Sequence, residues 1–325
     1  MPHPQLPSRS RRRAAGVIKL WEGLGSNLAT RLWTIQDAAL AFWAWTAAVW
    51  VIDHGGWPYL TQTMKPLFTE ASAAQLLAIG LAAVLAVAIS TILIARLTLP
   101  TLRALEGYGP LAGLRANRIA TWKTKLATLQ QRQVDATDDP AQTELQLALR
   151  RFPPEPDVMP TRIGNILRAG ERRPAYAYGL DPVVVWPQLW LTLPDQPRTD
   201  LTGARTELDR TVAAFIWAAS STLLGLLWWP AAITGPLVAW VIWRLWIPAA
   251  AETYAHTLSA LFDTHRFYLY DALHYPRPTS PSHEHTEGEK ITRILWTGGI
   301  PGDLPATFTT NKDAPTTPTT PPVPT

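Results

Sequence analysis

The sequence contains no cysteine among its 325 residues. This absence excludes disulfides, thiolate metal sites, iron–sulfur clusters and a cysteine nucleophile. Common catalytic motifs are missing too: the chain has no Gly-x-Ser-x-Gly elbow, no phosphate-binding Gly-rich loop ending in Lys-Ser or Lys-Thr, and no His-Glu-x-x-His. The sequence therefore predicts no cofactor and no metal, and it favours a non-enzymatic protein over an enzyme.

One histidine pattern could be mistaken for a metal site. His283-Glu284-His285 offers two imidazoles and a carboxylate, but it lies in a Pro-, Ser- and Glu-rich stretch without a third strong ligand. A structural or catalytic zinc site needs three or four protein ligands. We interpret the pattern as a solvated polar cluster in a linker.

A concentrated charge of one sign is also lacking. The formal net charge is +4, and the 16 basic residues between Arg96 and Arg210 are interspersed with 13 acidic ones. Proteins that bind nucleic acid gather their basic residues on one face or along one helix. We therefore predict no nucleic-acid partner.

What the sequence does contain is four long apolar stretches. A membrane-spanning helix needs about 20 mostly apolar residues. Four segments meet or nearly meet this length, namely Leu32–Ile52, Ala73–Ala95, Val212–Trp229 and Ala231–Ala251. The last two are joined by the uncharged stretch "WWPAAITGP", so they must form a tight helical hairpin. The prediction is an all-α integral membrane protein with four transmembrane helices in two hairpins, a helical cytoplasmic module and a disordered tail.

The distribution of basic residues predicts the orientation of these spans. Six basic residues precede the first span, whereas the loop from Asp53 to Ser72 contains only Lys65. Basic residues accumulate on the cytoplasmic side. We therefore expect both termini and the long basic segment to be cytoplasmic in a multi-pass protein of the plasma membrane. The six residues are Arg9, Arg11, Arg12, Arg13, Lys19 and Arg31.

Six regions follow from this topology. They are a basic cytoplasmic N-terminus (1–31), the first transmembrane hairpin (32–98), a cytoplasmic helical and juxtamembrane region (99–210), the second hairpin (211–251), a cytoplasmic helix with a linker (252–298) and a tail (299–325). The tail ends in "TTPTTPPVPT". It has too few apolar residues to offset the entropy of ordering, so we expect it to be disordered.

The cytoplasmic region begins with an amphipathic pattern. In Leu111–Val134, apolar residues recur three or four positions apart, which is typical of a helix with one buried face. Basic residues occupy other positions around this helix. They could bind anionic lipid headgroups, each contributing on the order of 1 kcal/mol, or they could form the solvated face of a helix packed on another helix. A second helix is expected at Ala141–Phe152, because Pro153-Pro154 ends it.

The segment 161–194 has no simple assignment. Thr161 is placed to cap a short charged helix, and residues 178–182 form a turn. The apolar run that follows cannot be one regular transmembrane helix, because Pro187 and Pro194 interrupt it. We expect it to lie in the membrane interface or beneath the spans. As docking residues the segment offers Arg162, Asn165, Arg168, Glu171, Asp181 and Trp186, with Arg168 and Glu171 spaced to pair.

The same segment resembles a known family. The string "TRIGNILR", followed by Glu171, Tyr178-Gly179, Asp181 and Trp186-Pro187, is similar to a "TRLGNVLRAAE…YGxDxVxxWPRL" block. That block marks a family of uncharacterised bacterial, actinobacterial-type, multi-spanning membrane proteins. "FDTHRFYL", 262–269, is similar to the family's "FDLYRFDL". The chain departs from the pattern at Gly170, Gln188 and Tyr268. The resemblance implies the topology, and it carries no function.

Two ionisable residues fall within the predicted spans. Asp37 lies at the start of the first span and Arg244 near the end of the fourth, both within about two turns of the cytoplasmic boundary. Burying such groups is costly, so they point to a function or to a partner. They could pair across the hairpins. Alternatively, Arg244 extends to the headgroups while Asp37 caps its helix or meets water.

These observations favour one hypothesis over two others. The first is a membrane protein that binds a protein partner or assembles as a homo-oligomer through its cytoplasmic module. The second is an oligomeric channel or transporter, which the many small residues of the second span would allow. The third is an enzyme acting on lipid at the interface, for which Arg172, Arg173 and Asp181 are the densest polar cluster.

Overall fold

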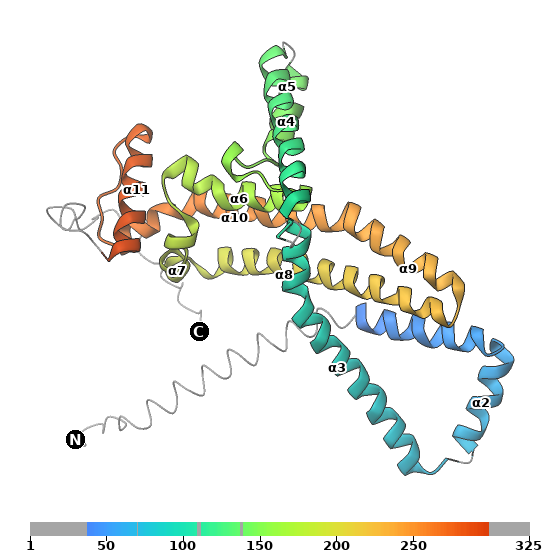
Figure 1. The fold of residues 1–325 in the computed structure, drawn as a ribbon. Coiled ribbons are helices and arrows are strands. Elements are labelled where there is room, and N and C mark those ends of the chain that lie inside the picture. Colours follow the sequence, from blue (N-terminus) through green and yellow to red (C-terminus); the bar gives the residue numbers. More distant parts are fainter. Residues whose placement is uncertain (1–37, 70, 109–111, 137–138, 299–325) are drawn as a thin grey trace, which may run out of the picture. The chain divides into compact units, whose positions relative to one another are not determined.

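A computed structural model describes residues 38–69, 71–108, 112–136 and 139–298 (Figure 1). Throughout these ranges the chain forms helices and connecting turns and contains no strand, which confirms the all-helical class. The chain divides into two compact units. Unit 1 comprises the described residues up to Leu102 together with Thr206–Ile247, and unit 2 comprises Arg103–Arg205 together with the described residues from Pro248 onward.

Unit 1 contains most of the apolar helices. They are the helix Ala38–Asp53, α2 (Trp57–Thr69), α3 (Ala73–Glu106, whose end belongs to unit 2), the second half of α8 (Asp195–Ser220), the 3-10 helix η2 (Ser221–Leu226), α9 (Trp229–Val241) and the π-helical turn η3 (Ile242–Trp246). Helix α2 occupies the stretch predicted to be a loop between the first two spans.

Aromatic side chains hold the helix Ala38–Asp53 in place. The Trp43 indole N–H donates to Ser90 Oγ on α3 at 3.1 Å. On the same helix, the ring of Phe42 lies 4.7 Å from that of Trp217 on α8, centroid to centroid. Aromatic pairs at this distance contribute beyond the area they bury. One helix therefore contacts both α3 and α8 through neighbouring aromatic residues.

Two helices are long and apolar enough to cross a membrane, considering only the described residues. They are α3 and the continuous helix Trp229–Ala272 that runs through α9, η3 and α10. The helix Ala38–Asp53 is apolar but shorter, and the predicted beginning of that span at Leu32 lies outside the described residues. The predicted four-span arrangement is therefore supported for two helices, and the other two spans stay a prediction.

The turn between the predicted third and fourth spans lies elsewhere than expected. The prediction joined the two spans through the uncharged stretch 228–236. In the structure η2 ends at Leu226 and α9 already begins at Trp229. Pro230 sits in the first turn of α9, where a missing N–H costs little, and Pro236 lies inside the helix.

Unit 2 is built from the polar and amphipathic helices. They are α4 (Ala112–Asp135), α5 (Asp139–Leu149), the 3-10 helix η1 (Glu155–Asp157), α6 (Arg162–Tyr178), α7 (Pro182–Thr192), the first part of α8, α10 (Ile247–Ala272) and α11 (Pro281–Thr297). The predicted helices at 111–134 and 141–152 correspond to α4 and α5 within a few residues.

The core of unit 2 lies among α7, the start of α8, α10 and α11. Its fully buried residues include Leu180 just before α7, Val185 and Leu189 on α7, and Phe262 and Tyr270 on α10. Each large apolar side chain removed from water contributes about 1.5–3 kcal/mol. The interrupted apolar run of 183–194 is thus a short helix with one face buried in this core.

Helix α11 replaces the linker expected after α10. Glu284, predicted to be part of a solvated cluster, is 8% exposed and forms an ion pair with Arg266. Ile291 is buried in the core. The prediction failed because the composition of 276–290 is polar, whereas three buried positions, Glu284, Gly288 and Ile291, suffice to dock this helix.

Several predictions lie outside the described residues. These are the basic N-terminus 1–31, the ionisable Asp37 and the tail 299–325.

Candidate functional site

Helix α6 is fixed at both ends by short-range contacts. As predicted, Thr161 is its N-cap: the hydroxyl accepts a hydrogen bond from Gly164 N at 3.0 Å and also donates to Glu106 O at 2.9 Å. At the other end Gly179 adopts a left-handed conformation with φ of 71°. The buried face of α6 is apolar except for Asn165, and the charged residues of this helix lie at its less buried positions.

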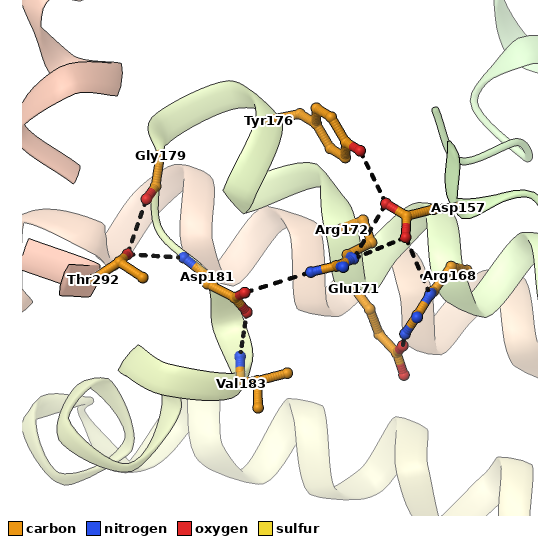
Figure 2. Close-up of polar contacts among 9 residues, drawn as sticks. All are labelled: Asp157, Arg168, Glu171, Arg172, Tyr176, Gly179, Asp181, Val183 and Thr292. Carbon is orange, nitrogen blue, oxygen red and sulfur yellow. Dashed lines mark hydrogen bonds and ion pairs between the residues drawn. The ribbon is translucent and has the colours of Figure 1, made fainter. Parts of the chain in front are cut away.

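Asp157 gathers polar groups from α6. Figure 2 shows Arg172 Nε donating to its carboxylate at 3.2 Å and the Tyr176 hydroxyl donating at 3.0 Å. Arg168 Nε lies 3.9 Å from the same carboxylate, and Arg168 Nη1 lies 3.6 Å from Glu171. The side chain of Asp157 is only 12% exposed. These contacts fasten η1 to one side of α6.

The turn after α6 is fastened to α11. Asp181 caps α7 by accepting a hydrogen bond from Val183 N at 3.0 Å, and it lies 3.5 Å from Arg172 Nη1 (Figure 2). Thr292 on α11 accepts from Asp181 N at 3.1 Å and donates to Gly179 O at 2.9 Å. One threonine hydroxyl therefore satisfies two backbone groups of this turn.

Burial and neighbouring charges shift the pKa values of this network in opposite directions. Burial alone would lower the pKa of Arg172, but the Asp157 carboxylate outweighs burial and the pKa is raised. Burial raises the pKa of Glu171, against the opposing charge of Arg168. The Arg172 guanidinium therefore stays charged, while the Glu171 carboxylate holds its charge less firmly.

A second carboxyl group whose pKa is raised lies in unit 2. Glu106 ends α3 well beyond the apolar part of that helix, Ala73–Ala95. Burial, followed by the negative charge of Glu171, raises the pKa of Glu106 to about 7. Near neutral pH this side chain is thus about half protonated.

A large cavity in unit 2 opens beside the network. Its volume is about 890 Å³, at the upper end for small-molecule sites. Its polar lining comes from α6 and α11. The apolar lining comes from the start of α7, from α10 and from the end of α11, namely Pro182, Val183, Val184, Trp186, Pro187, Tyr254, Leu258 and Trp296.

A smaller cavity adjoins it. About 350 Å³ in volume, it shares Trp186, Pro187 and Tyr254 with the larger one and continues to Trp190 and Leu201. The guanidinium of Arg205 lies 5.7 Å from the centre of the Tyr254 ring, within the range of a cation–π contact. The two cavities therefore share three lining residues, two of them aromatic.

The second feature of unit 2 is the hairpin of α4 and α5. In Figure 1 it extends away from α6, α7 and α11. Its base is held by Trp122, whose indole N–H donates to Pro160 O at 3.1 Å and whose ring lies 5.6 Å from that of Phe152. Beyond this base, α5 buries no residue, and Leu147 and Val134 are 54% and 80% exposed.

The structure separates the six proposed docking residues into two groups. Arg168, Glu171, Asp181 and Trp186 line the large cavity together. Arg162 instead lies 3.5 Å from Glu252 on α10. Asn165 is buried: its amide accepts from Met159 N at 2.7 Å and donates to Met159 O at 3.0 Å.

Arg244 lies in the π-helical turn η3 and is exposed on unit 1. Because Asp37 is not among the described residues, the pairing of these two residues stays a prediction.

Sequence reasoning missed several residues of the site. Asp157 follows a Pro-rich stretch, and Thr292 and Trp296 lie on the helix that was expected to be a linker. Only the spacing of Glu289, Thr292 and Trp296, by three and then four residues, could have indicated a helical face there. Among the residues that the structure describes, no group of three His, Asp or Glu side chains could hold a metal ion.

Comparison with known proteins adds no family. No family model matches the chain, and neither a curated protein nor a solved structure matches it significantly. The resemblance to the bacterial membrane-protein family therefore stays a prediction, and function has to be inferred from the site.

Proposed function

We propose that the protein is a non-enzymatic integral membrane protein whose cytoplasmic helical unit binds a protein partner or a second copy of the chain. In this proposal four helices span the plasma membrane in two hairpins. Both termini and unit 2 lie in the cytoplasm. The hairpin of α4 and α5 is the surface that contacts the partner.

The exposure of α3 supports a lipid environment for unit 1. Only 11% of its most apolar stretch is buried inside the protein, whereas the core helix of a soluble protein is mostly buried. Leu77 is 76% exposed, and Val84 and Ile89 are each 64% exposed. Apolar surface costs about 25 cal/mol per Å² in water. A bilayer would remove that cost along the whole helix.

The second apolar helix gives the same indication. Trp229 and Trp246, which flank the apolar part of α9, are 72% and 58% exposed. Tryptophan prefers the headgroup level of a membrane. Arg244 lies two residues before Trp246, so its long side chain could extend to the headgroups at that level.

The observation that carries partner binding is the hairpin itself. A helix with no buried residue gains little from its own fold, because most helical stability in proteins comes from packing an apolar face. Leu147 nevertheless remains exposed on α5, and Val134 remains exposed where α4 ends. A second protein surface would bury both.

The remainder of unit 2 supplies a rigid base for this hairpin. Arg151, just after α5, lies 3.0 Å from Glu252 on α10, and Lys123 on α4 lies 3.4 Å from Glu155. In this proposal the polar residues of α6 hold helices together, and none of them acts as a nucleophile or general base.

Site-directed crosslinking tests the proposal. Because the chain has no cysteine, Leu147→Cys can carry a thiol-reactive photocrosslinker in native membranes. Gly203→Cys on α8 is the matched control, because Gly203 is exposed and nothing lies within 4 Å of a side chain there. We expect one adduct of discrete mass at position 147 and none at 203.

The mass of the adduct identifies the partner. An increase equal to the chain itself would indicate self-assembly, and any other discrete increase would indicate a different protein. Equal, diffuse crosslinking at both positions would contradict partner binding by the hairpin.

A further inference from the structure

The large cavity of unit 2 contains cationic groups that its own carboxylates leave incompletely bonded. A guanidinium has five N–H donors. Arg172 uses two of them, on Asp157 and on Asp181. Arg168 forms ion pairs at 3.6 and 3.9 Å, and its buried Nε has no hydrogen-bond partner.

Leaving a buried charged donor without a partner is costly. Both guanidiniums line the cavity, so an oxyanion placed there would complete their hydrogen bonds. Planar guanidinium donors match the geometry of phosphate and carboxylate groups.

The charges that line the cavity are balanced in number. Three arginines, Arg168, Arg172 and Arg293, face three acids, Glu171, Asp181 and Glu289. Glu289 is the most exposed acid of this set, at 56% of its side chain, and its carboxylate lies 3.7 Å from His285 Nδ1 on the same helix. A purely anionic ligand would therefore gain little electrostatic free energy, because the positive and negative charges of the lining offset each other. A head group that carries a phosphate and a cationic amine matches both halves of this lining.

The remaining wall is apolar. Val183, Val184 and Trp186 on α7 face the same space as Trp296 on α11. Beyond Trp186 and Tyr254 the smaller cavity continues the apolar surface to Leu201. A ligand that fills both hollows therefore has a polar head and an extended apolar part.

Helix α10, which lines the cavity with Tyr254 and Leu258, follows the apolar segment of α9 and η3 directly in the sequence. Tyr254 follows Trp246 by eight residues, and eight residues span at most roughly 29 Å even when fully extended. If the chain spans a membrane, as proposed above, a membrane lipid is the amphiphile that fits a lining with a polar and an apolar part.

We propose that this cavity binds the head of one membrane phospholipid, with its phosphodiester on Arg168 and Arg172 and its glycerol and upper chains against Val183, Trp186 and Trp296. An ammonium-bearing head group such as ethanolamine places its amine toward Glu289. The site is separate from the hairpin of α4 and α5.

Lipid titration of the full-length protein, followed by native mass spectrometry in detergent, tests the proposal. The probes are phosphatidylethanolamine, phosphatidylglycerol, diacylglycerol and inorganic phosphate. Val183→Trp fills the cavity mouth without disturbing the core, because Val183 is 78% exposed. Leu191→Trp is the matched control: Leu191 is on the same helix, equally exposed, and does not line either cavity.

We expect phosphatidylethanolamine to bind with one-to-one stoichiometry and at least as tightly as phosphatidylglycerol. Val183→Trp and Arg168→Gln should weaken it by about tenfold or more, while Leu191→Trp stays close to the unmodified protein. A melting temperature measured for each variant separates lost binding from lost folding, and Val183→Trp decides the matter if Arg168→Gln unfolds.

Four results would overturn the proposal. Equal binding by Val183→Trp and Leu191→Trp would place the lipid elsewhere. An affinity that increases with the net negative charge of the lipid would indicate binding to a general basic surface. If diacylglycerol, which has no phosphate, bound equally well, the contact between the phosphate and the arginines would be refuted. If inorganic phosphate displaced the lipid, the ligand of the cavity would be a soluble phosphate. The crosslinking test at Leu147 is independent of all four.

Discussion

Asn165 illustrates at the residue scale how one polar side chain connects two segments. It is 2% exposed, and its amide satisfies both the N–H and the C=O of Met159. Sequence analysis proposed it as a docking residue because it is polar on a charged helix. Its role in the structure is to hold the segment before α6 against that helix. The sequence could not show this, because the partner is a backbone group whose position depends on the fold.

Asn165→Ala should therefore destabilise unit 2. The substitution leaves two buried backbone groups of Met159 without partners, which costs about 2–3 kcal/mol in the free energy of unfolding. Gln130→Ala, at an exposed position of α4, serves as the control. Thermal melting in detergent should show a clearly lower midpoint for Asn165→Ala alone. Equal midpoints for the two variants would contradict this role.

The contribution of Glu106 to the stability of the fold depends on pH, and the direction of its pKa shift predicts the sign of that dependence. Its pKa is raised from 4.5 to about 7 in the folded chain, first by burial and then by Glu171, while Arg205, Arg103 and Arg168 oppose the shift. The folded state thus favours the protonated acid. Stability from this group is fully present below about pH 4.5 and is lost as the pH rises through about 7.

Glu106→Gln should mimic the protonated form at every pH. Compared with the unmodified protein, the variant should be equally stable near pH 4.5 and more stable at pH 8. The gain should be on the order of 2 kcal/mol, because partial exposure of the carboxylate screens part of the shift. Melting temperatures measured from pH 4.5 to 8 check this. A difference that does not grow with pH would refute it.

At the scale of elements, sequence patterns located most helices but misjudged their connections. Thr161 and Pro153-Pro154 marked helix ends correctly, because capping and proline chemistry are local. The turn before α9 was misplaced, because a proline is tolerated both in a turn and in the first turn of a helix. Helix α11 was missed, because its docking depends on groups in α6 and α10 that are distant in the sequence.

Docking of α11 depends on close backbone approach at two glycines. A Cβ at Gly288 would lie 1.8 Å from Tyr178 O, and one at Gly179 would lie 2.0 Å from His285 O. These contacts bring Thr292 within hydrogen-bond distance of the turn before α7. The cavity wall formed by α11 therefore exists only because both positions lack a side chain.

Gly288→Ala should displace α11. The added methyl group meets backbone that cannot move away easily, so we expect a loss of about 1–3 kcal/mol in the free energy of unfolding. In Gly203→Ala, nothing lies within 4 Å of the new methyl group, and a glycine-to-alanine change in a helix gains up to about 1 kcal/mol. Hydrogen exchange of residues 281–297 measures the effect. Unchanged protection in Gly288→Ala would contradict the packing described.

At the scale of the whole molecule, the two units differ in composition. Apolar residues gather on the helices of unit 1, and the paired charges gather in unit 2. Hydropathy alone could predict that division, because it depends only on composition along the chain. The cavity could not be predicted in the same way. Its lining comes from four helices, and only α6 and α7 carried a local pattern that indicated a site.

Cysteine labelling of intact cells tests the proposed membrane arrangement most directly. The chain has no cysteine, so a membrane-impermeant maleimide reports only introduced positions. Gln62→Cys on α2 and Gly203→Cys on α8 are both exposed. We expect position 62 to react in intact cells and position 203 to react only after permeabilisation. Labelling of position 203 in intact cells, or a chain that remains in solution without detergent, would contradict the account.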